Sequence, residues 1–473
     1  MNIFHLSAEC YPVAKVGGLG DVVGALPKYL CKAGVNASVV LPYYDRKFVQ
    51  ENSFDLEFKS SIKVGKQVFD YEILKESKRQ LGFDLFLIYI PGLLDRPEIY
   101  SYPDEIEQFI AFQICFLDWI VKSGNKPDII HCHDHHAGLI PFLMRYSYPF
   151  KSLAGIATVC TIHNAEYQGC LGWDKMDLLP EFDPSKSEYL SWLTCINSLA
   201  SSVKCSTRFT TVSPSYLDEL SQNSSGLEKL FQQEKNKGLG IINGIDTQVW
   251  DPEKDPLIDK NFSTETVDES KLENKKKLCE EFGFNPEKPL LIFIGRLVVE
   301  KGADLLAETI NNCLKTFDNQ INILVLGSGN QKIEKELGKI NLKHRKHYGL
   351  HIGYNEALAH RMYASADFLL MPSRVEPCGL NQLYAIRYGT IPIVHKTGGL
   401  KDTVIDLENK DGYGLCIDEL SIKNLIQAIG RAISLFANRE MLTKTRRKMM
   451  ALNFSWDESS KKYIHLYEHL LGG

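Results

Sequence analysis

The chain has 473 residues, of which 44% are hydrophobic and 24% are charged. This length exceeds what one ordinary core organises, so the composition predicts a globular protein of two domains. The formal net charge of −5 argues against a dedicated nucleic-acid-binding protein, which normally carries a basic excess. The 12 cysteines include no C-x-x-C pair, no signal peptide is recognisable, and no apolar run has the length of a membrane span. We therefore expect a cytoplasmic protein with reduced, mostly buried cysteines and no nucleic-acid or membrane partner.

The first half alternates short apolar runs with longer amphipathic segments. The runs that predict strands are Asn2–Ser7, Ala37–Leu41, Leu85–Ile90, Asp128–His131, Ile156–Ile162, Phe209–Val212 and Gly240–Ile242. The segments that predict helices include Asp21–Ala33, Glu105–Ser123 and Ala137–Tyr146. Continuous apolar strands that alternate with helices predict a parallel sheet covered on both faces.

The second half repeats this scheme more cleanly. Strands are predicted at Leu290–Ile294, Ile321–Leu326, Phe368–Met371, Ile391–Val394 and Gly414–Ile417. Helices are predicted at Gly302–Lys315, Glu356–Ser365, Leu380–Tyr388 and Ile422–Ala437. Each half is therefore expected to be a doubly wound α/β domain that binds ligands at the carboxyl ends of its strands.

Two further segments shape the predicted architecture. The polar stretch from Asp251 to Lys277 is interpreted as a boundary region that leads into a solvated helix. The last stretch, from Trp456 to Leu470, has the spacing of an amphipathic helix packed onto another surface. No motif in Asn52–Gln80 or Phe182–Ser202 indicates a function.

Two segments far apart in the chain both read K-x-G-G-L-x-D-x-V. The first runs from Lys15 to Val23 and the second from Lys396 to Val404, each between an apolar run and a helix-like pattern. A glycine pair lets the backbone approach a ligand, the helix N-terminus behind it favours phosphate, and the lysine adds a positive charge. Two tight turns with chance similarity are the ordinary alternative. The repetition favours two similar domains with a phosphorylated ligand between them.

Cations and a carboxylate follow two predicted strands of the second half. Arg296 ends the first of these strands, and Lys301 precedes the next helix, so the two side chains are placed to clamp a diphosphate. Ordinary surface cations are the alternative. Glu376 precedes a helix start where Pro377, with Gly379 nearby, leaves backbone N–H groups of the segment exposed toward a ligand. Its carboxylate suits sugar hydroxyls or a developing positive charge, or else it is a partner for the helix dipole.

The segment His131–His136, which reads H-C-H-D-H-H, has the appearance of a metal site. His131 and His133 share one face of an extended segment, as zinc ligands do. No second ligand group at zinc-like spacing follows, so polar contacts to a neutral ligand are favoured over a metal. His163 and Asn164 end another strand and suit sugar hydroxyls, with a polar pair that closes the sheet as the alternative. Asn243 closes a further strand and is otherwise part of a turn.

Two missing motifs limit the chemistry. No Asp-x-Asp occurs anywhere, so the sequence offers no carboxylate pair at that spacing for Mg²⁺ on a nucleotide diphosphate. No complete G-x-x-x-x-G-K-[ST] occurs either, which argues against an NTPase.

Taken together, these motifs resemble those of the bacterial and plastid-type glycogen (starch) synthases, which are GT-B glycosyltransferases. The matching segments follow the family's order over nearly the whole chain: Ser7–Glu9, Lys15–Val22, His133–Ala137, His163–Asn164, Asn243–Asp246, Gly295–Arg296, Lys301–Gly302, Glu376–Leu380 and Thr397–Leu400. Two positions depart from the pattern. His135 stands where the family often has an aromatic residue, and Asn381 where it often has a threonine, so an amide replaces one hydroxyl near the phosphate.

The resemblance implies two Rossmann-like, doubly wound domains that face a cleft. Residues 1–245 would form the N-terminal domain on the acceptor side, residues 246–455 the C-terminal domain on the donor side, and residues 456–473 a helix that crosses back to the first domain. The implied reaction transfers glucose from ADP-glucose to the non-reducing end of an α-1,4-glucan such as glycogen, with retained configuration, in glycogen biosynthesis.

The resemblance also implies roles for single residues. The catalytic residues would be His163, Arg296, Lys301 and Glu376, with the cations stabilising the leaving diphosphate without a metal or another cofactor. The substrate-binding residues would be Lys15, Gly17, Gly18, Asp21, Asn164, Asn243, Cys378, Gly379, Leu380 and Thr397. Glu9, Asp134 and His136 would serve the acceptor side or support loops, and Asp21 is alternatively an N-cap. No carboxylate is evident as a nucleophile on the opposite sugar face, so a front-face route is expected in which the leaving phosphate helps deprotonate the acceptor.

Other functions compete with this interpretation. A sucrose- or trehalose-type synthase or a sugar-nucleotide epimerase would share the fold, but the K-V-G-G-L-G-D loop favours a glucan synthase. A catalytically silent glucan-binding protein would be expected to have lost a cation or the carboxylate, and all of them are present. The residues do not distinguish ADP-glucose from UDP-glucose, and they do not indicate oligomeric state, regulation or preferred chain length.

Overall fold

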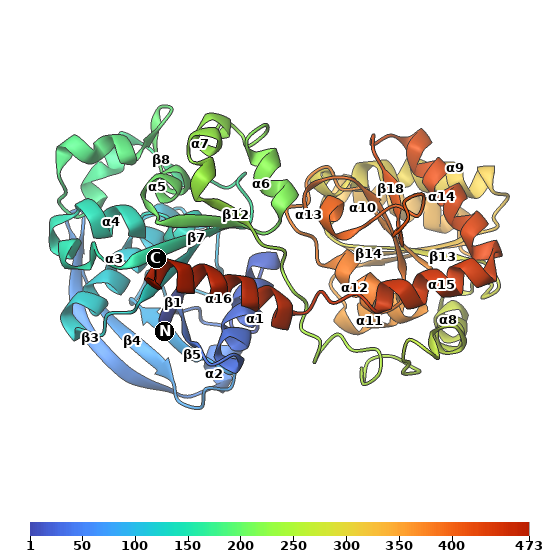
Figure 1. Ribbon diagram of the computed structural model, residues 1–473, viewed down its shortest axis with the longest axis horizontal. Coiled ribbons are helices and arrows are strands. Elements are labelled where there is room, and N and C mark those ends of the chain that lie inside the picture. The colour runs from blue at the N-terminus through green and yellow to red at the C-terminus, as the bar shows by residue number, and fades with distance from the viewer. Residues whose placement is uncertain (473) are drawn as a thin grey trace. The chain divides into compact units, whose positions relative to one another are not determined.

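The computed structural model describes residues 1–472, which divide into two compact units (Figure 1). Unit 1 comprises Met1–Gly244 together with the C-terminal segment that starts at Trp456, and unit 2 comprises Ile245–Ser455. Among the described residues, no helix combines the length and the apolar character needed to cross a membrane.

Unit 1 is built on a nine-stranded sheet with the order β12-β11-β7-β6-β1-β2-β5-β4-β3. Its strands are β1 (Asn2–Leu6), β2 (Asn36–Pro42), β3 (Phe54–Val64), β4 (Gln67–Glu76), β5 (Asp84–Tyr89), β6 (Ile129–His133), β7 (Ala157–Ile162), β11 (Arg208–Thr211) and β12 (Gly238–Gly240). The strands from β12 to β5 are parallel, and β1 and β6 at the centre are almost completely buried. Helices that cover both faces favour apolar strands in this position, and β1 and β6 nevertheless carry His5, His131 and His133.

The prediction of a purely parallel sheet in the first half is wrong at one edge. β3 and β4 form an antiparallel hairpin that pairs with β5, and Gly65 at φ +60° lies in the tight turn between them. The hairpin is half solvated, so exposed and partly buried residues are interspersed along β3. The strand therefore lacks the apolar run that marks a buried strand. A second antiparallel sheet joins β8 (Cys170–Leu171), β10 (Cys195–Asn197) and β9 (Ser191–Trp192).

The helices of unit 1 include one from the far end of the chain. They are α1 (Gly18–Lys32), α2 (Lys47–Glu51), α3 (Glu105–Ser123), α4 (Ile140–Tyr146), α5 (Ser198–Cys205), α6 (Pro214–Leu220), α7 (Glu228–Gln233) and α16 (Trp456–Gly472). α16 runs beside α1, where Trp456, Tyr463 and Tyr467 join the core that contains Val22 and Leu26 (Figure 1). The prediction of a C-terminal helix that returns to the first domain is confirmed.

Unit 2 contains a six-stranded, fully parallel sheet with the order β15-β14-β13-β16-β17-β18. Its strands are β13 (Leu290–Ile294), β14 (Asn322–Gly327), β15 (Tyr348–Ile352), β16 (Phe368–Met371), β17 (Ile391–His395) and β18 (Leu415–Ile417). Its helices are α8 (Val267–Phe282), α9 (Leu306–Thr316), α10 (Gln331–His344), α11 (Glu356–Ser365), α12 (Asn381–Arg387), α13 (Gly398–Thr403), α14 (Ile422–Ala437) and α15 (Arg439–Met450).

The expectation that α8 is a solvated helix is wrong for two of its lysines. Lys271 is buried and its ammonium donates to the carbonyl oxygens of Tyr363 and Tyr388 at 2.9 Å each, at the C-terminal ends of α11 and α12. Lys275 is also buried and pairs with Asp367 at 2.7 Å. Burial of an ammonium is tolerated where its protons find acceptors, which the composition of α8 does not reveal.

Candidate functional site

In each unit the candidate residues gather where the strand order reverses. In unit 2 the chain proceeds outward from β13 in one direction and from β16 in the other, and in unit 1 β1 and β6 are the corresponding neighbours. In such sheets ligands bind beyond the carboxyl ends of the strands at this switch point. Lys301 follows β13 and Glu376 follows β16, whereas Lys15 follows β1 and Asp134 follows β6.

The loop after β1 is held by the carboxylate of Glu9. Its Oε2 accepts hydrogen bonds from the backbone N–H groups of Val16 at 2.6 Å and Gly17 at 2.9 Å. Lys15 Nζ lies 2.6 Å from Asp21 Oδ1, and both side chains are about one third exposed. α1 begins at Gly18 with Gly17 as its N-cap, so the alternative role of Asp21 as an N-cap is wrong. Asp21 lies within the first turn and is the ion-pair partner of Lys15.

The first glycine pair leaves space beside it. A Cβ added at Gly17 or Gly18 would meet no atom within 4 Å. Among the described residues, the backbone N–H of Gly18 has no hydrogen-bond partner in the loop. This part of the loop therefore presents bare backbone, the surface that a phosphate requires.

Glu9 also belongs to a group of polar and aromatic side chains from separate elements. Tyr100 donates its hydroxyl to Glu9 Oε1 at 2.7 Å, and its ring stacks on His136 with centroids 5.2 Å apart. Phe109 of α3 packs edge-on against His136 at 4.6 Å. Tyr100 was missed in the sequence because it lies 91 residues from Glu9 and in no recognisable motif.

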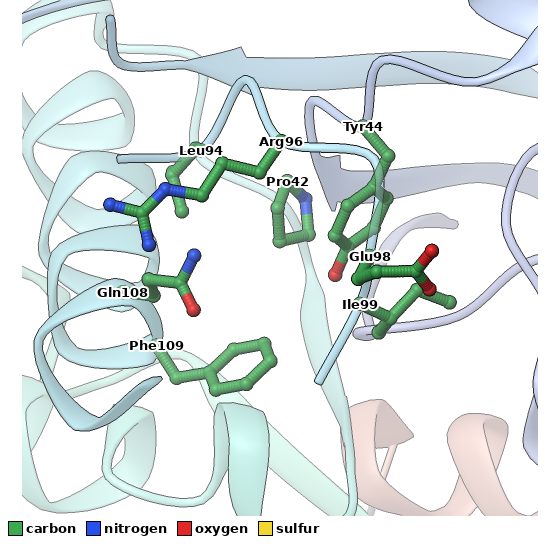
Figure 2. Close-up of a pocket in the computed structure, with 8 residues that line it drawn as sticks. All are labelled: Pro42, Tyr44, Leu94, Arg96, Glu98, Ile99, Gln108 and Phe109. Carbon is green, nitrogen blue, oxygen red and sulfur yellow. The ribbon is translucent and has the colours of Figure 1, made fainter. Parts of the chain in front are cut away.

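A small pocket lies next to this group. It is lined by Pro42, Tyr44, Leu94, Arg96, Glu98, Ile99, Gln108 and Phe109 (Figure 2). The Tyr44 hydroxyl and the Gln108 amide enter the pocket from different sides, as Figure 2 shows. Tyr44 Oη and Gln108 Oε1 are buried and have no partner within residues 1–472. Two such atoms suit an ordered water, and the pocket is too small for a sugar.

Asp134 adopts a strained conformation at the end of β6. Its φ of 54° and ψ of −169° are sparsely populated for a residue with a side chain. The conformation is fixed by two hydrogen bonds, from Asp134 N to Thr161 O at 2.9 Å and from His163 N to Asp134 Oδ1 at 2.7 Å. Burial raises the pKa of Asp134 to about 7. The backbone N–H groups that donate hydrogen bonds to its carboxylate have the opposite, smaller effect.

The histidine segment forms hydrogen bonds that use its ring nitrogens. His131 contacts Tyr467 Oη and Thr161 Oγ1, both at 2.6 Å. His133 contacts His5 at 3.1 Å and His163 at 3.0 Å. Of the six ring nitrogens of His5, His131 and His133, only His5 Nε2 has no partner in the described chain. The three rings lie close enough together to suggest a metal site. Five of their six ring nitrogens are already hydrogen-bonded, so at most one lone pair is left for a metal, and a metal site needs at least three ligands.

The catalytic candidates of unit 2 include a charged pair. Lys301 Nζ lies 2.7 Å from both carboxylate oxygens of Glu376, and Ser373 Oγ donates to Glu376 Oε2 at 2.9 Å. Arg374 holds the two loops together, because its backbone N–H donates to Glu300 O at 2.7 Å and its guanidinium to Val299 O at 2.6 Å. The pair is thus assembled from loops that follow two neighbouring strands.

Arg296 lies at the same edge of the sheet as this pair. It is exposed and, within the described residues, has no ion-pair or hydrogen-bond partner. Gly302 allows the neighbouring turn to pack closely, since its φ is +68° and a Cβ there would lie 2.0 Å from Pro372 O. The loop after β13 therefore offers one engaged cation, Lys301, and one unengaged cation, Arg296.

The second glycine pair differs from the first. Gly398 has φ +44°, and a Cβ there would lie 2.2 Å from Glu376 O. A Cβ at Gly399 would lie 2.1 Å from Cys378 O, and the Gly399 N–H donates to Glu376 O at 3.0 Å. The two K-x-G-G-L segments thus have different surroundings: the first glycine pair borders open space, whereas the second packs against the loop that carries Glu376.

The remaining donor-side candidates surround that loop. Cys378 is buried, and Gly379 has φ +74°, where an added Cβ would lie 2.4 Å from Gln382 Oε1. The Thr397 hydroxyl donates to Arg374 O at 3.2 Å. Asn381 donates its amide to Ile294 O at 2.7 Å, which ties the start of α12 to the end of β13. The position where the family often has threonine thus serves a structural contact.

Comparison with known proteins places this geometry in a family. Residues 2–233 match the starch synthase catalytic domain, and residues 274–449 match the glycosyl transferases of group 1. The glycogen synthase of Flavobacterium johnsoniae is 51% identical, with 100% of this chain and 99% of that protein covered. The glycogen synthase of Thermodesulfovibrio yellowstonii is 36% identical, with coverage of 100% and 98%.

The chain belongs to the glycogen (starch) synthase family.

Solved structures agree with this assignment. The catalytic domain of starch synthase IV from Arabidopsis thaliana, bound to ADP and acarbose, superposes with a TM-score of 0.89 at 30% identity and covers 100% of this chain and 99% of its own. Sucrose-phosphate synthase from Thermosynechococcus elongatus, at 18% identity and a TM-score of 0.63 over 99% and 98%, shares the fold alone. The predicted resemblance and the two-domain GT-B architecture are confirmed, and the protein is a glycosyltransferase.

The structure groups most of the residues that the sequence singled out for this family. Glu9, Lys15 and Asp21 lie on one loop and helix start, and Asp134 and His163 are joined by a hydrogen bond. Two candidates lie apart from such contacts. The Asn164 side chain accepts a hydrogen bond from Glu166 N in a local turn, although its backbone N–H acts with that of His163 to lower the pKa of Asp134, and Asn243 Oδ1 has no partner in the part of the chain described.

Proposed function

We propose that the protein transfers glucose from ADP-glucose to the non-reducing end of an α-1,4-glucan, with retained configuration, in glycogen biosynthesis. The observation that carries this proposal is the cluster of Arg296, Lys301 and Glu376 at the switch point of unit 2. It combines cations suited to a diphosphate with a carboxylate suited to a sugar. The full-length similarity to proteins named glycogen synthase supports the same reaction.

On the donor side, we assign the diphosphate to the cations. Arg296 is unengaged within residues 1–472, and Lys301 is held 2.7 Å from Glu376. Charge develops on the phosphate oxygens as the glycosidic bond breaks, so fixed cations stabilise the transition state more than the ground state. Lys15 and the free N–H of Gly18 add the corresponding groups of unit 1. The similarity to a starch synthase structure that holds ADP supports adenine as the base.

The glucose moiety is assigned to Glu376 and to the loop that follows it. The backbone N–H groups of Gly379 and Leu380 donate no hydrogen bond to the described backbone outside the helices. Together with Cys378, we assign them the role of hydroxyl ligands on the loop that follows Glu376. His163 contributes an imidazole from unit 1, and Asn164, Asn243 and Thr397 complete the proposed substrate-binding set.

On the acceptor side, we assign the glucan to the group formed by Glu9, Tyr100, Asp134 and His136. Tyr100 bridges Glu9 and His136, so an aromatic face and two polar groups lie side by side. A glucan offers hydroxyls and an apolar ring face, which such a group accommodates. The Arabidopsis starch synthase structure holds acarbose in addition to ADP, and this similarity supports a site for a sugar chain.

The chemical step uses the leaving group as the base. The bond from glucose C1 to the phosphate oxygen breaks, the bond from C1 to the acceptor O4 forms, and the acceptor proton passes to the departing phosphate oxygen. We do not assign Glu376 as nucleophile or base, because its carboxylate is proposed to bind the glucose hydroxyls once the diphosphate has taken Lys301 from it. The front-face route therefore assigns Glu376 to binding and charge stabilisation.

We propose further that the reaction needs no metal ion and takes place in the cytoplasm. Three cations and backbone N–H groups supply the positive charge that Mg²⁺ supplies in other transferases, and the chain lacks an Asp-x-Asp pair. All 12 cysteines are free, which fits a reducing compartment.

Glucose incorporation into a glycogen primer tests the proposal. The purified protein is given ADP-glucose or UDP-glucose, each with and without a metal chelator. We expect incorporation from ADP-glucose that resists the chelator, and much less from UDP-glucose. A preference for UDP-glucose would refute the donor assignment, and chelator-sensitive transfer would refute metal independence. Glycogen binding without transfer from either donor would indicate a catalytically silent glucan-binding protein.

A further inference from the structure

Three histidine rings in unit 1 form one hydrogen-bonded column. His163 Nε2 pairs with His133 Nδ1 at 3.0 Å, and His133 Nε2 pairs with His5 Nδ1 at 3.1 Å. The rings come from β1, from β6 and from the residue after β7, three strands that are neighbours in the sheet. His5 and His133 are completely buried, whereas His163 is partly exposed. The column thus runs from the candidate site into the core.

Each ring in the column carries a single proton at neutral pH. Burial lowers the pKa of His5 and of His163 to about 3, and it lowers the pKa of His133 well below its usual range. A neutral imidazole has one donor nitrogen and one acceptor nitrogen. Since the rings are linked in series, the direction of one N–H fixes the other two. Only two arrangements of the whole column are therefore consistent with both hydrogen bonds.

The two arrangements differ at the ends of the column. In the outward arrangement His5 Nδ1–H donates to His133, His133 Nδ1–H donates to His163, and His163 carries its proton on Nδ1. In the inward arrangement every proton moves to the other nitrogen, and His5 Nε2–H points into the core. His163 Nδ1 has no partner in the described chain, but it is accessible to solvent. Water therefore satisfies it in either arrangement.

The buried end decides between them. His5 Nε2 is buried and has no hydrogen-bond partner within residues 1–472, so the inward arrangement would leave a buried N–H without an acceptor. Orphaned buried N–H groups are rarer in proteins than under-satisfied acceptors. His131, whose ring stacks on that of His133 at 4.5 Å, offers no acceptor because both of its nitrogens are bonded to Tyr467 and Thr161. The outward arrangement is favoured.

We propose that His133 is a positioning residue that holds His163 in its Nδ1–H tautomer, so that His163 donates a hydrogen bond to the sugar rather than accepting one. The identity of the acceptor, an oxygen of the glucose moiety, rests on the proposed function. The tautomer itself is a property of the free protein. His5 ends the column at its buried side, where no acceptor is available for an N–H on His5 Nε2.

Nuclear magnetic resonance of the ligand-free, ¹⁵N-histidine-labelled full chain tests the tautomer directly. The signals of His163 are assigned by their loss in His163→Gln. We expect the ¹⁵N shifts of a protonated Nδ1 and a bare Nε2. A protonated Nε2 would overturn the proposal, whatever the activity of the protein. If the expected tautomer is found and glucose transfer is absent, the column stands and the proposed function fails, so the two failures are distinguishable.

A matched pair of variants tests the positioning role. His133→Asn retains an N–H donor toward His163. His133→Asp introduces a side chain of nearly the same shape as asparagine, but its carboxylate only accepts and so forces His163 into the Nε2–H tautomer. We expect kcat/KM to stay within about tenfold of the native value for H133N and to fall by about 100-fold or more for H133D, the range seen when a transition-state donor is lost. The His163 shifts should reverse only in H133D.

Equal losses in both variants, with His163 in its native tautomer, would show that His133 has only a packing role. Native activity in H133D would also overturn the proposal. His5→Phe is the control, because it shortens the column and still leaves its buried end without an acceptor, so the His163 tautomer should not change. If H133D fails to fold, the measurement on the unaltered protein decides.

Discussion

Lys301 Nζ lies 2.7 Å from both oxygens of Glu376, so the cation and the carboxylate proposed for the donor site neutralise each other when no ligand is bound. The Glu376 side chain is only 8% exposed, and that of Lys301 is 24% exposed. In the proposed complex, a diphosphate competes with Glu376 for Lys301, and a glucose moiety competes with Lys301 for Glu376. The proposed binding of the complete donor exchanges one internal contact for two contacts to the ligand.

This exchange predicts opposite effects of Glu376→Gln on binding and on turnover. Without the carboxylate, Lys301 is free for phosphate, and ADP should bind about fivefold more tightly, which corresponds to about 1 kcal/mol. Turnover should fall by about 100-fold or more, because the variant lacks the charge that is proposed to stabilise the reacting sugar. Calorimetric titration with ADP and the incorporation assay measure the two effects. Ser373→Ala, which leaves the ion pair intact, should not tighten ADP, and weaker ADP binding in E376Q would contradict the exchange.

Lys15→Ala should abolish most activity and leave stability almost unchanged. The Lys15–Asp21 pair is about one third exposed, so its loss costs at most about 1 kcal/mol, or a few degrees in Tm. Turnover should fall by about 100-fold if Lys15 contacts the donor. Thermal melts and the incorporation assay provide the measurement. Asp21→Asn breaks the same pair and keeps the cation, so it should retain more activity, and native turnover in K15A would remove Lys15 from the site.

The two glycine pairs should respond differently to alanine. Gly18→Ala adds a methyl group in open space, so we expect a native Tm and a raised KM for the sugar nucleotide. Gly399→Ala places a methyl group 2.1 Å from Cys378 O, so it should lower Tm strongly or prevent folding, because overpacking costs about 1–3 kcal/mol or more. Melting curves of both variants, with donor kinetics for G18A, test this. Equal stability of the two would refute the structural difference.

Asp134 predicts a pH-dependent penalty on stability. Its folded pKa of about 7 exceeds the unfolded value of about 3.9, so the folded state holds the proton more tightly between these values. The unfolded state binds fewer protons there, and the contribution of Asp134 to stability falls as pH rises from about 4 to about 7 and is constant beyond. Asp134→Asn removes this dependence. Its Tm should exceed that of the native protein by an amount that grows across this window. The corresponding gain in the free energy of unfolding is at most about 1.4 kcal/mol for each unit of the pKa difference.

Thermal melts at several pH values between 4 and 8 provide the measurement for Asp134. A Tm difference that shrinks as pH rises would show that the carboxylate stabilises the fold in its ionised form. The cost of the strained φ at position 134 is expected in both the native protein and D134N, so it cancels when their Tm values are compared. Loss of activity in D134N together with gained stability would mark a residue kept for function.

Much of the fold, and the grouping of several candidate site residues, followed from the sequence alone. Buried parallel strands have apolar residues on both faces, so β13 and β16 were located without error, and the family's motifs gave the loops that follow them. The spacing in α16 showed that this helix packs on a partner. Local patterns determine what kind of element forms, because burial dictates residue type position by position.

Other features were decided only by contacts between distant segments. The β3–β4 hairpin is half solvated and has no apolar run, and the buried ammonium of Lys271 depends on carbonyl oxygens that lie 92 or more residues away. Tyr100 joins the site through Glu9, and the column from His5 to His163 links three strands. The two K-x-G-G-L segments read alike and differ in their surroundings. A sequence states which groups are present, whereas their partners, and hence their protonation and exposure, exist only in the folded chain.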